Sequence, residues 1–167
     1  MGTRPVVSQV VIDPPRIEPT AWTRISFGVI NTGTSPWTVV RVTVPDAIAV
    51  LGVDAPPGWK AAWLPATDST PQTITWSGGA VHRAGLGTFV FLGRVGADVP
   101  RRELRFPVEL TDASGTVREL RRGGDGIEPR MLIAGTTQIS PWAAFALAGA
   151  AFGLAVLALV FVVGGKR

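Results

Sequence analysis

Hydrophobic positions along the chain follow two different patterns. Residues 143–163 read AAFALAGAAFGLAVLALVFVV, a run of 21 residues without a charged side chain, a hydroxyl or a side-chain amide. As a helix rising 1.5 Å per residue, such a run spans about 30 Å, the thickness of the hydrocarbon core of a bilayer. A domain of this size cannot bury a helix that is apolar on every side. We therefore predict a single C-terminal transmembrane helix over residues 142–165.

The residues that flank this run suit the two surfaces of a membrane. Trp142 precedes the run, and the amphipathic indole ring favours the headgroup level. Lys166 and Arg167 follow it as a basic tail, residues 166–167, and their charged ends can remain in water. Trp142, Lys166 and Arg167 are thus the expected membrane-interface residues.

Upstream of this run, hydrophobic and polar residues alternate in short stretches. Ile25, Phe27 and Val29 lie on one side of such a stretch, and Arg24 and Ser26 lie on the other. Alternation with a period of two, bounded by Gly, Pro, Asp and Ser, is typical of half-buried antiparallel strands. The strands predicted in this way are 6–12, 24–30, 37–44, 47–53, 72–76, 87–95, 105–110 and 116–120.

This pattern predicts an all-β domain of the immunoglobulin-like antiparallel sandwich type over residues 6–122. Residues 1–5 are expected to form a short N-terminal tail. Residues 123–141 begin with two glycines, lack a sustained helical period and are expected to link the domain to the membrane helix.

The apolar run contains a stripe of small residues. Ala146, Gly149, Ala150 and Gly153 follow one another at helical spacing and include a GxxxG motif. Small residues let a second transmembrane helix approach closely, so this stripe is a candidate contact for the helix of a partner protein. Because alanine and glycine are common in such helices, chance occurrence is an equal alternative.

Composition excludes several classes of function. The chain has no cysteine and one histidine, so disulfide frameworks, zinc ribbons and sites with several histidines are excluded. The net charge is +4, half of it from the last two residues, and no basic stripe interleaves with aromatic residues, so nucleic acid is not an expected partner. No nucleotide-binding or nucleophile motif is present. An enzyme, a resident cofactor and a small-molecule substrate are therefore not expected.

Three residues of the domain remain candidates for a functional surface. His82 stands in an expected loop, where a surface histidine is the favoured interpretation and a metal ligand is the alternative. Trp59 and Trp63 flank Lys60-Ala61-Ala62 in or near a loop. Tryptophans usually pack in the core, but an exposed one offers a protein contact.

The orientation in the membrane rests on conflicting signals. Lys166 and Arg167 directly after the helix indicate a cytoplasmic C-terminus and an extracytoplasmic domain. The first five residues, however, lead straight into the domain without the apolar core of a signal peptide. A cytoplasmic domain with a C-terminal tail anchor is the alternative. We expect a single-pass protein of the cell membrane with its domain outside.

Several short motifs follow one another along the domain: QVVIDP at 9–14, PGW at 57–59, TWSGG at 75–79, FPV at 106–108 and GTVR at 115–118. Their order resembles the YcnI-like copper-binding domain family of bacterial envelope proteins. The resemblance covers about residues 7 to 122. It implies an immunoglobulin-like sandwich, often followed by a C-terminal transmembrane helix, and copper handling outside the cytoplasm.

The ligands that this resemblance implies are replaced in the present chain. The family uses a histidine at the mature N-terminus, a glutamate and a tryptophan, and the matching positions hold Gln9, Gly85 and Leu120. Gln9 is a poor copper ligand, and Gly85 and Leu120 provide none. The sequence thus predicts a membrane-anchored interaction module, an accessory subunit of a larger membrane complex, with redox or copper-containing complexes among the candidates. A divergent copper chaperone that uses His82 is the alternative.

Overall fold

The domain is a β-sandwich in which each sheet contributes one apolar face to a common core. The computed structural model describes residues 9–124 and 126–134. These residues form strands and no helix. The strands are β1 (Gln9–Asp13), β2 (Arg16–Ile17), β3 (Trp22–Ile30), β4 (Trp37–Thr43), β5 (Ile48–Asp54), β6 (Lys60–Leu64), β7 (Thr73–Val81), β8 (Leu86–Val95), β9 (Glu103–Arg105), β10 (Val108–Asp112), β11 (Val117–Leu120) and β12 (Arg130–Ile133).

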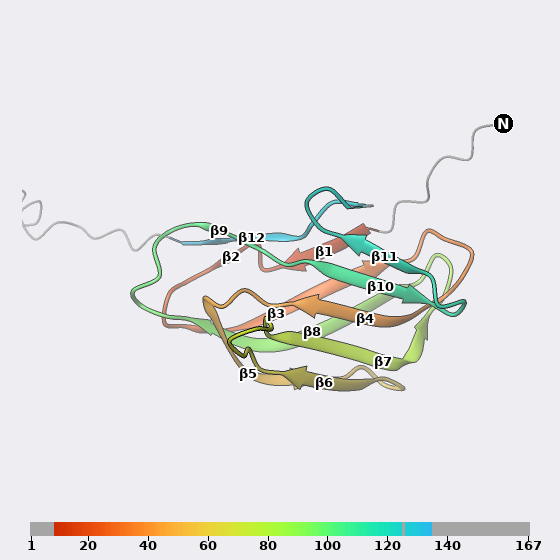
Figure 1. Ribbon diagram of the computed structural model, residues 1–167, viewed down its shortest axis with the longest axis horizontal. Helices are drawn as coiled ribbons and strands as arrows, with labels where there is room; N and C mark the ends of the chain where they lie inside the picture. Colours follow the sequence, from red (N-terminus) through yellow and green to blue (C-terminus); the bar gives the residue numbers. More distant parts are fainter. Residues whose placement is uncertain (1–8, 125, 135–167) are drawn as a thin grey trace, which may run out of the picture. The chain divides into compact units, whose positions relative to one another are not determined.

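Two antiparallel sheets form the layers of the sandwich (Figure 1). One has the strand order β1-β3-β8-β5, and the other has the order β11-β10-β4-β7-β6. A small third sheet, β2-β12-β9, joins β2 and β12 in parallel and β12 and β9 in antiparallel fashion. The expected all-β, immunoglobulin-like sandwich is therefore confirmed.

The core explains why alternation in the sequence predicts these strands. Ile25, Phe27 and Val29 of β3 are fully buried, whereas the residues between them are at most half-buried. The Phe27 ring stacks on Phe91 of β8 at a centroid distance of 6.2 Å and meets Phe106 edge-on at 5.6 Å. Each aromatic ring buries roughly 150–250 Å² on folding, so this cluster is a major source of the sandwich's stability.

Two strands lie where the sequence predicted other structure. β6 occupies residues that were expected in or near a loop, and its pattern gives little sign of a strand because it is an edge strand with only one partner, β7. β12 lies inside the expected 123–141 linker and extends the domain to at least Ala134. Met131 and Ile133 of β12 are buried, but four residues are too few for their alternation to predict a strand.

Several predictions concern residues outside the described ranges. They are the 1–5 tail, the 142–165 helix with its small residues Ala146, Gly149, Ala150 and Gly153, and the interface residues Trp142, Lys166 and Arg167. Among residues 9–124 and 126–134, no helix is long and apolar enough to cross a bilayer.

Candidate interaction site

The connection from β5 to β6 crosses from the four-stranded to the five-stranded sheet. After Asp54 the chain continues Ala55-Pro56-Pro57-Gly58, and the amide of Trp59 donates a hydrogen bond to the carbonyl of Pro56 at 2.9 Å. Gly58 has φ of +82°, a conformation that glycine adopts without steric cost. Proline at the second position and glycine at the third favour this tight turn. The turn carries the chain away from the four-stranded sheet to the other sheet.

The early departure of β5 leaves part of β8 with a single partner. The last residue pair between β5 and β8 is Asp54 with Val90, whereas β3 pairs with β8 as far as Leu86. Residues 86–89 therefore have a strand on one side, and no other described residue forms a backbone hydrogen bond to their opposite edge. Peptide groups along such an edge are available to a further strand.

Trp59 fills the space between the two sheets beside this edge. Its ring meets Phe89 of β8 edge-on at a centroid distance of 4.8 Å. On the other side it lies against Gly79 of β7, where an added Cβ would come within 2.2 Å of Trp59 Nε1. The indole of Trp76 packs on Phe89 at 5.4 Å and donates a hydrogen bond of 2.7 Å to the carbonyl of Asp54. Trp59 thus has a rigid support on both sheets.

A buried asparagine fixes the β7–β8 loop at the same end. Asn31 is fully buried, and its side-chain amide donates to the carbonyls of Val81 at 2.8 Å and Ser35 at 2.9 Å. Its main chain exchanges two hydrogen bonds with the loop, from the Ala84 amide at 2.8 Å and to the Gly85 carbonyl at 3.1 Å. The loop that carries His82 is therefore attached to the end of β3 by hydrogen bonds on both sides of His82.

These parts surround a hollow of about 320 Å³, which we call the Trp59 hollow. That volume is at the lower end of the range of ligand pockets and suits one or two side chains. The lining is mostly apolar or backbone and comprises Pro56, Trp59, Ala80, Val81, His82, Gly85, Leu86, Gly87 and Thr88.

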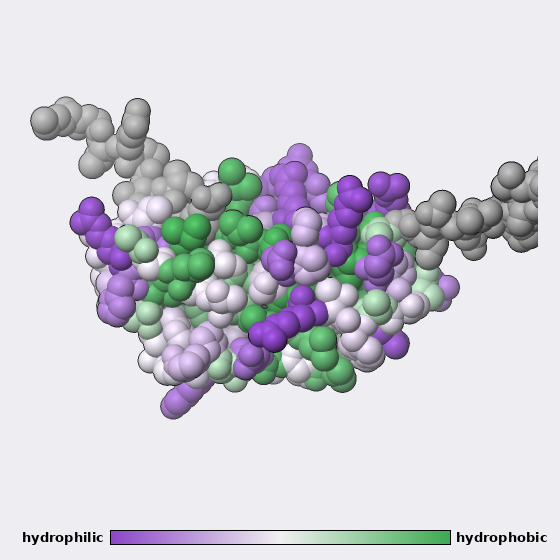
Figure 2. Space-filling model, turned by 180° about the vertical axis from the view of Figure 1, so that it is seen from behind, coloured by the Kyte–Doolittle hydropathy of each residue, from purple (hydrophilic) through white to green (hydrophobic). Residues whose placement is uncertain are grey.

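An exposed apolar patch adjoins the Trp59 hollow through Leu86. Ile30 of β3 pairs with Leu86 of β8, and Val11 of β1 pairs with Gly28, two residues before Ile30. The side chains of Val11, Ile30 and Leu86 therefore lie on the same face of the four-stranded sheet, which is its outer face. Leu86 is 67% exposed and Val11 is 49% exposed. Figure 2 shows the domain from the side of this sheet, with apolar residues in green gathered between polar ones. We call Val11, Ile30 and Leu86 the Leu86 patch.

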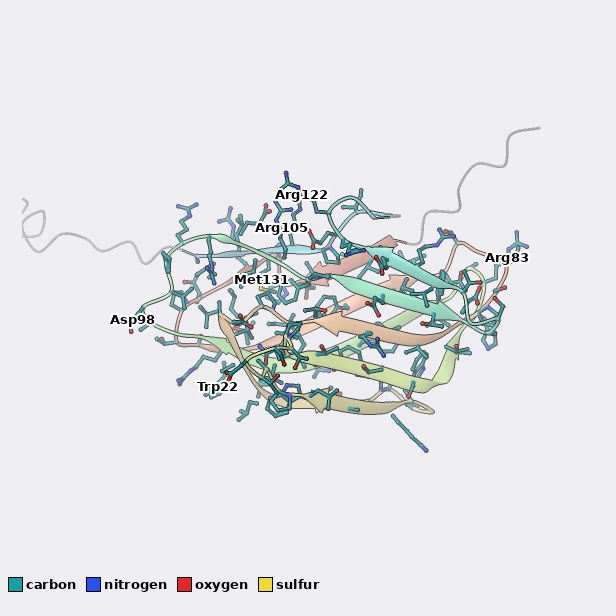
Figure 3. The ribbon with its side chains drawn as sticks, in the orientation of Figure 1. Trp22, Arg83, Asp98, Arg105, Arg122 and Met131 are labelled. Carbon is teal, nitrogen blue, oxygen red and sulfur yellow. The ribbon has the colours of Figure 1, made fainter. Side chains whose placement is uncertain are left out.

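The charges around the site are unevenly placed. His82 and Arg83 are exposed in the β7–β8 loop, and Figure 3 shows the Arg83 side chain pointing away from the sandwich. Lys60 is exposed at the start of β6. At the opposite end of the free β8 edge, Asp54 is paired with Arg24 at 3.8 Å. The loop end of the site is therefore positively charged or hydrogen-bond donating.

The structure separates the aromatic and imidazole side chains that the sequence singled out. Trp59 and His82 both line the Trp59 hollow. Trp63 instead lies on β6 opposite Ile74 and is 41% exposed there. Of the two candidate tryptophans, only Trp59 therefore belongs to this site.

The three positions that match the copper ligands of the resembled family lie on different elements. Gln9 begins β1 and pairs with Ile30 of β3. Gly85 lies in the β7–β8 loop and lines the Trp59 hollow. Leu120 is buried at the end of β11 on the other sheet.

Sequence reasoning missed Asn31, Pro56 and Leu86 as parts of the site. The Pro-Pro-Gly turn was the available signal for Pro56, since it predicts the end of a strand. Asn31 and Leu86 become recognisable only once strands distant in the sequence are paired.

The site offers mainly apolar and backbone contacts. Its surface consists of an indole, aliphatic side chains, one imidazole, the hydroxyl of Thr88 and peptide groups of the β8 edge. Across the described part of the chain, no three side chains of His, Cys, Asp or Glu gather where they could hold a metal ion. Apolar surface beside unpaired peptide groups is suited to binding a polypeptide.

Comparisons with known proteins support the fold. No protein-family model matches the sequence, and a search of curated proteins finds no relative. An uncharacterised protein of Nocardia farcinica with an immunoglobulin-like fold has a TM-score of 0.62 and 20% identity, over 75% of this chain and 98% of that one.

Cohesin modules have the same architecture. A non-cellulosomal cohesin of Archaeoglobus fulgidus has a TM-score of 0.50 and 12% identity, over 79% of this chain and 94% of that one. A type I cohesin of Clostridium thermocellum, solved in complex with a dockerin, has a TM-score of 0.52 and 9% identity, over 77% and 99%. At these identities the likeness establishes the fold alone.

Replacement of Gly79 by alanine tests the support of Trp59. The new methyl group would overlap the indole, so we expect Gly79→Ala to lower the free energy of unfolding by about 1–3 kcal/mol. Thermal unfolding of each variant in detergent, monitored by near-UV circular dichroism, measures this change in stability. Gly52→Ala is the matched control, because a Cβ there meets no atom within 4 Å. Equal stability of the two variants would contradict this packing.

A copper titration tests the alternative prediction for His82. A single imidazole without a second strong ligand holds Cu(II) weakly, so we expect the full chain in detergent to lose Cu(II) to a competing chelator of submicromolar affinity. A one-to-one complex that survives this competition and disappears in His82→Ala would instead establish a copper-binding protein.

Proposed function

We propose that this protein is a membrane-anchored, non-catalytic interaction module that acts as an accessory subunit of a larger membrane complex. The domain binds a partner protein through the Trp59 hollow and the Leu86 patch. The apolar run at residues 143–163 anchors it in the cell membrane, with the domain outside and Lys166 and Arg167 on the cytoplasmic side.

The exposed apolar surface around Leu86 is the observation that carries this proposal. In an antiparallel sandwich the outer face of each sheet is normally polar. The centre of the five-stranded sheet follows this rule, with Arg41 bonded to Glu109 at 3.1 Å and with Thr75 and Ser77 beside them. Two large apolar side chains that this sheet does expose, Leu64 and Val117, lie on its edge strands β6 and β11. The four-stranded sheet departs from it at the Leu86 patch, and contiguous exposed apolar surface is typical of interaction sites.

The rigidity of the site also supports binding. Asn31 holds the loop, and the indoles of Trp59 and Trp76, from the side of the five-stranded sheet, both pack on Phe89 of the four-stranded sheet. A surface that is already ordered loses less conformational entropy when a partner binds.

The cohesin likeness is consistent with this function by analogy. A cohesin of comparable fold was solved bound to its dockerin, so a sandwich of this kind serves as a docking module in that protein. Our proposal for this chain rests on its own exposed surface, because fold and function are only loosely linked.

A second contact is proposed within the membrane. Ala146, Gly149, Ala150 and Gly153 would form one face of the transmembrane helix and pack against the helix of the partner complex. Two separate contacts, one in the domain and one in the bilayer, would strengthen each other. Once one contact has formed, it raises the effective concentration of the groups that form the other.

A charge introduced at Leu86 tests the partner contact of the domain. In Leu86→Asp a carboxylate replaces the centre of the patch, so recovery of partner proteins from mild detergent should fall by on the order of tenfold, as the loss of one buried leucine implies. Quantitative mass spectrometry of proteins co-purified with the tagged full chain provides the measurement.

Val117→Asp is the matched control for this test. Val117 is 51% exposed on β11, on the other sheet, so the same charge is added to a comparably accessible position. If both variants retain the wild-type set of partners, the Leu86 patch is not an interaction site.

Extraction of membranes with alkaline carbonate tests the anchor. The full chain should remain with the membrane, because a helix of about 20 apolar residues does not leave the bilayer when surface contacts are stripped. A variant truncated before Trp142 should be released. Release of the intact chain by carbonate would contradict membrane anchoring.

A further inference from the structure

The free edge of β8 determines what kind of polypeptide the site can take. Residues 86–89 are the continuation, beyond Val90, of the part of β8 that pairs with β5. Their sequence, Leu-Gly-Thr-Phe, includes neither proline nor charge, the features that usually protect an edge from pairing. The segment is about 13 Å long at 3.3 Å per residue. A strand of about four residues would complete the sheet at this position.

The interior side of this edge has room for a side chain. Gly87 points inward, since an added Cβ would meet Val81 Cγ2 at 2.6 Å and the ring of Phe89 at 2.9 Å. The space over Gly87 is thus filled by Val81 and Phe89, and the room for an inward side chain of a new strand is the adjoining Trp59 hollow of about 320 Å³, which Gly87 also lines. Alternate residues of the new strand would face outward, next to Thr88 and Leu86.

The direction of β5 determines which end of an added strand approaches the β7–β8 loop, which carries His82 and Arg83. β5 runs antiparallel to β8, from Ile48 opposite Val95 to Asp54 opposite Val90. A strand that continues in the same direction along residues 89 to 86 ends at the β7–β8 loop. Its C-terminal end thus approaches His82 and Arg83, which favour an acidic side chain or a free carboxylate.

We infer that the site binds an extended segment of a partner protein as an added strand. The segment runs antiparallel to β8 and in line with β5. It places an apolar side chain in the Trp59 hollow and an acidic group, at its C-terminal end, beside Arg83 and His82. This inference rests on the proposed function, and it specifies the chemistry of the partner at the same site.

Selection from random octapeptides with free C-termini tests this inference on the full chain in lipid nanodiscs. Enriched peptides should carry apolar or β-branched residues at alternate positions and an acidic residue near the C-terminus. Their affinities, measured by fluorescence polarisation, should fall about five- to tenfold in His82→Glu with Arg83→Glu, where attraction becomes repulsion. Arg101→Glu with Arg102→Glu makes a charge change at least as large, at exposed residues just before β9, and should leave affinity unchanged.

Methylation of single amide nitrogens in the selected peptide tests strand addition directly. Alternate peptide groups of a strand bond to the neighbouring strand, so methylation should abolish binding at every second position and be tolerated between them. Amide hydrogen exchange of residues 86–89 should slow when the peptide binds.

Three results would overturn the inference. They are no enrichment above empty nanodiscs, equal loss of affinity in the two double variants, and sensitivity to methylation without alternation. If one of these occurs while Leu86→Asp still removes a co-purified partner and Val117→Asp does not, the domain is an interaction module that binds in another way. Failure of both experiments would reject the proposed function as well.

Discussion

A polar group buried between two sheets is costly unless it finds hydrogen-bond partners, and this cost determines how two loops of the domain are held. An unpaired buried polar group costs several kcal/mol by transfer from water to an apolar solvent, and about 1–3 kcal/mol by mutational measurement. Native structures therefore rarely leave such a group without a partner. Asn31 satisfies both amide hydrogens on carbonyls of two separate segments, and its Oδ1 accepts from the amide of Gly33. The side-chain amide of Gln72 donates to the carbonyls of Pro45 and Ile48, at the connection from β4 to β5.

The candidate site depends on this pairing at one end of the sandwich. Asn31 ties the β7–β8 loop to the end of β3, while the indole of Trp76 ties the end of β5 to β7. Between these two attachments the Pro56-Pro57-Gly58 turn leads the chain out of the four-stranded sheet. The turn makes both the hollow and the unpaired part of β8, because a strand that stops early exposes the edge of its neighbour.

The sequence predicted the sandwich because alternation is a local signal. β3 and β8 follow it closely, since every second residue enters the core. β6 escaped prediction because it is an edge strand with a single partner and shows little alternation, and β12 because four residues are too few for alternation to be recognised. The resemblance to a copper-binding family agrees with the sandwich fold, while its copper chemistry and the membrane helix remain predictions.

The candidate site was only partly predictable from such a local signal. Trp59 and Trp63 lie four residues apart in the sequence, yet Trp59 lines the hollow while Trp63 lies on the edge strand β6. Leu86 looks like an ordinary strand residue until its pairing with Ile30 places it on an outer face. Exposure is a property of the assembled sheets, and no pattern of a few residues contains it.

In the proposed function, a partner protein covers the corner of the sandwich at Leu86. The most direct measurement replaces Leu86 by a photo-reactive amino acid in the full chain, within intact membranes, and compares it with the same replacement at Val117. We expect irradiation to form a discrete covalent adduct from position 86 that maps to an extended segment of one partner, and none from position 117. An adduct of equal yield from position 117, or none from either position, would contradict this function.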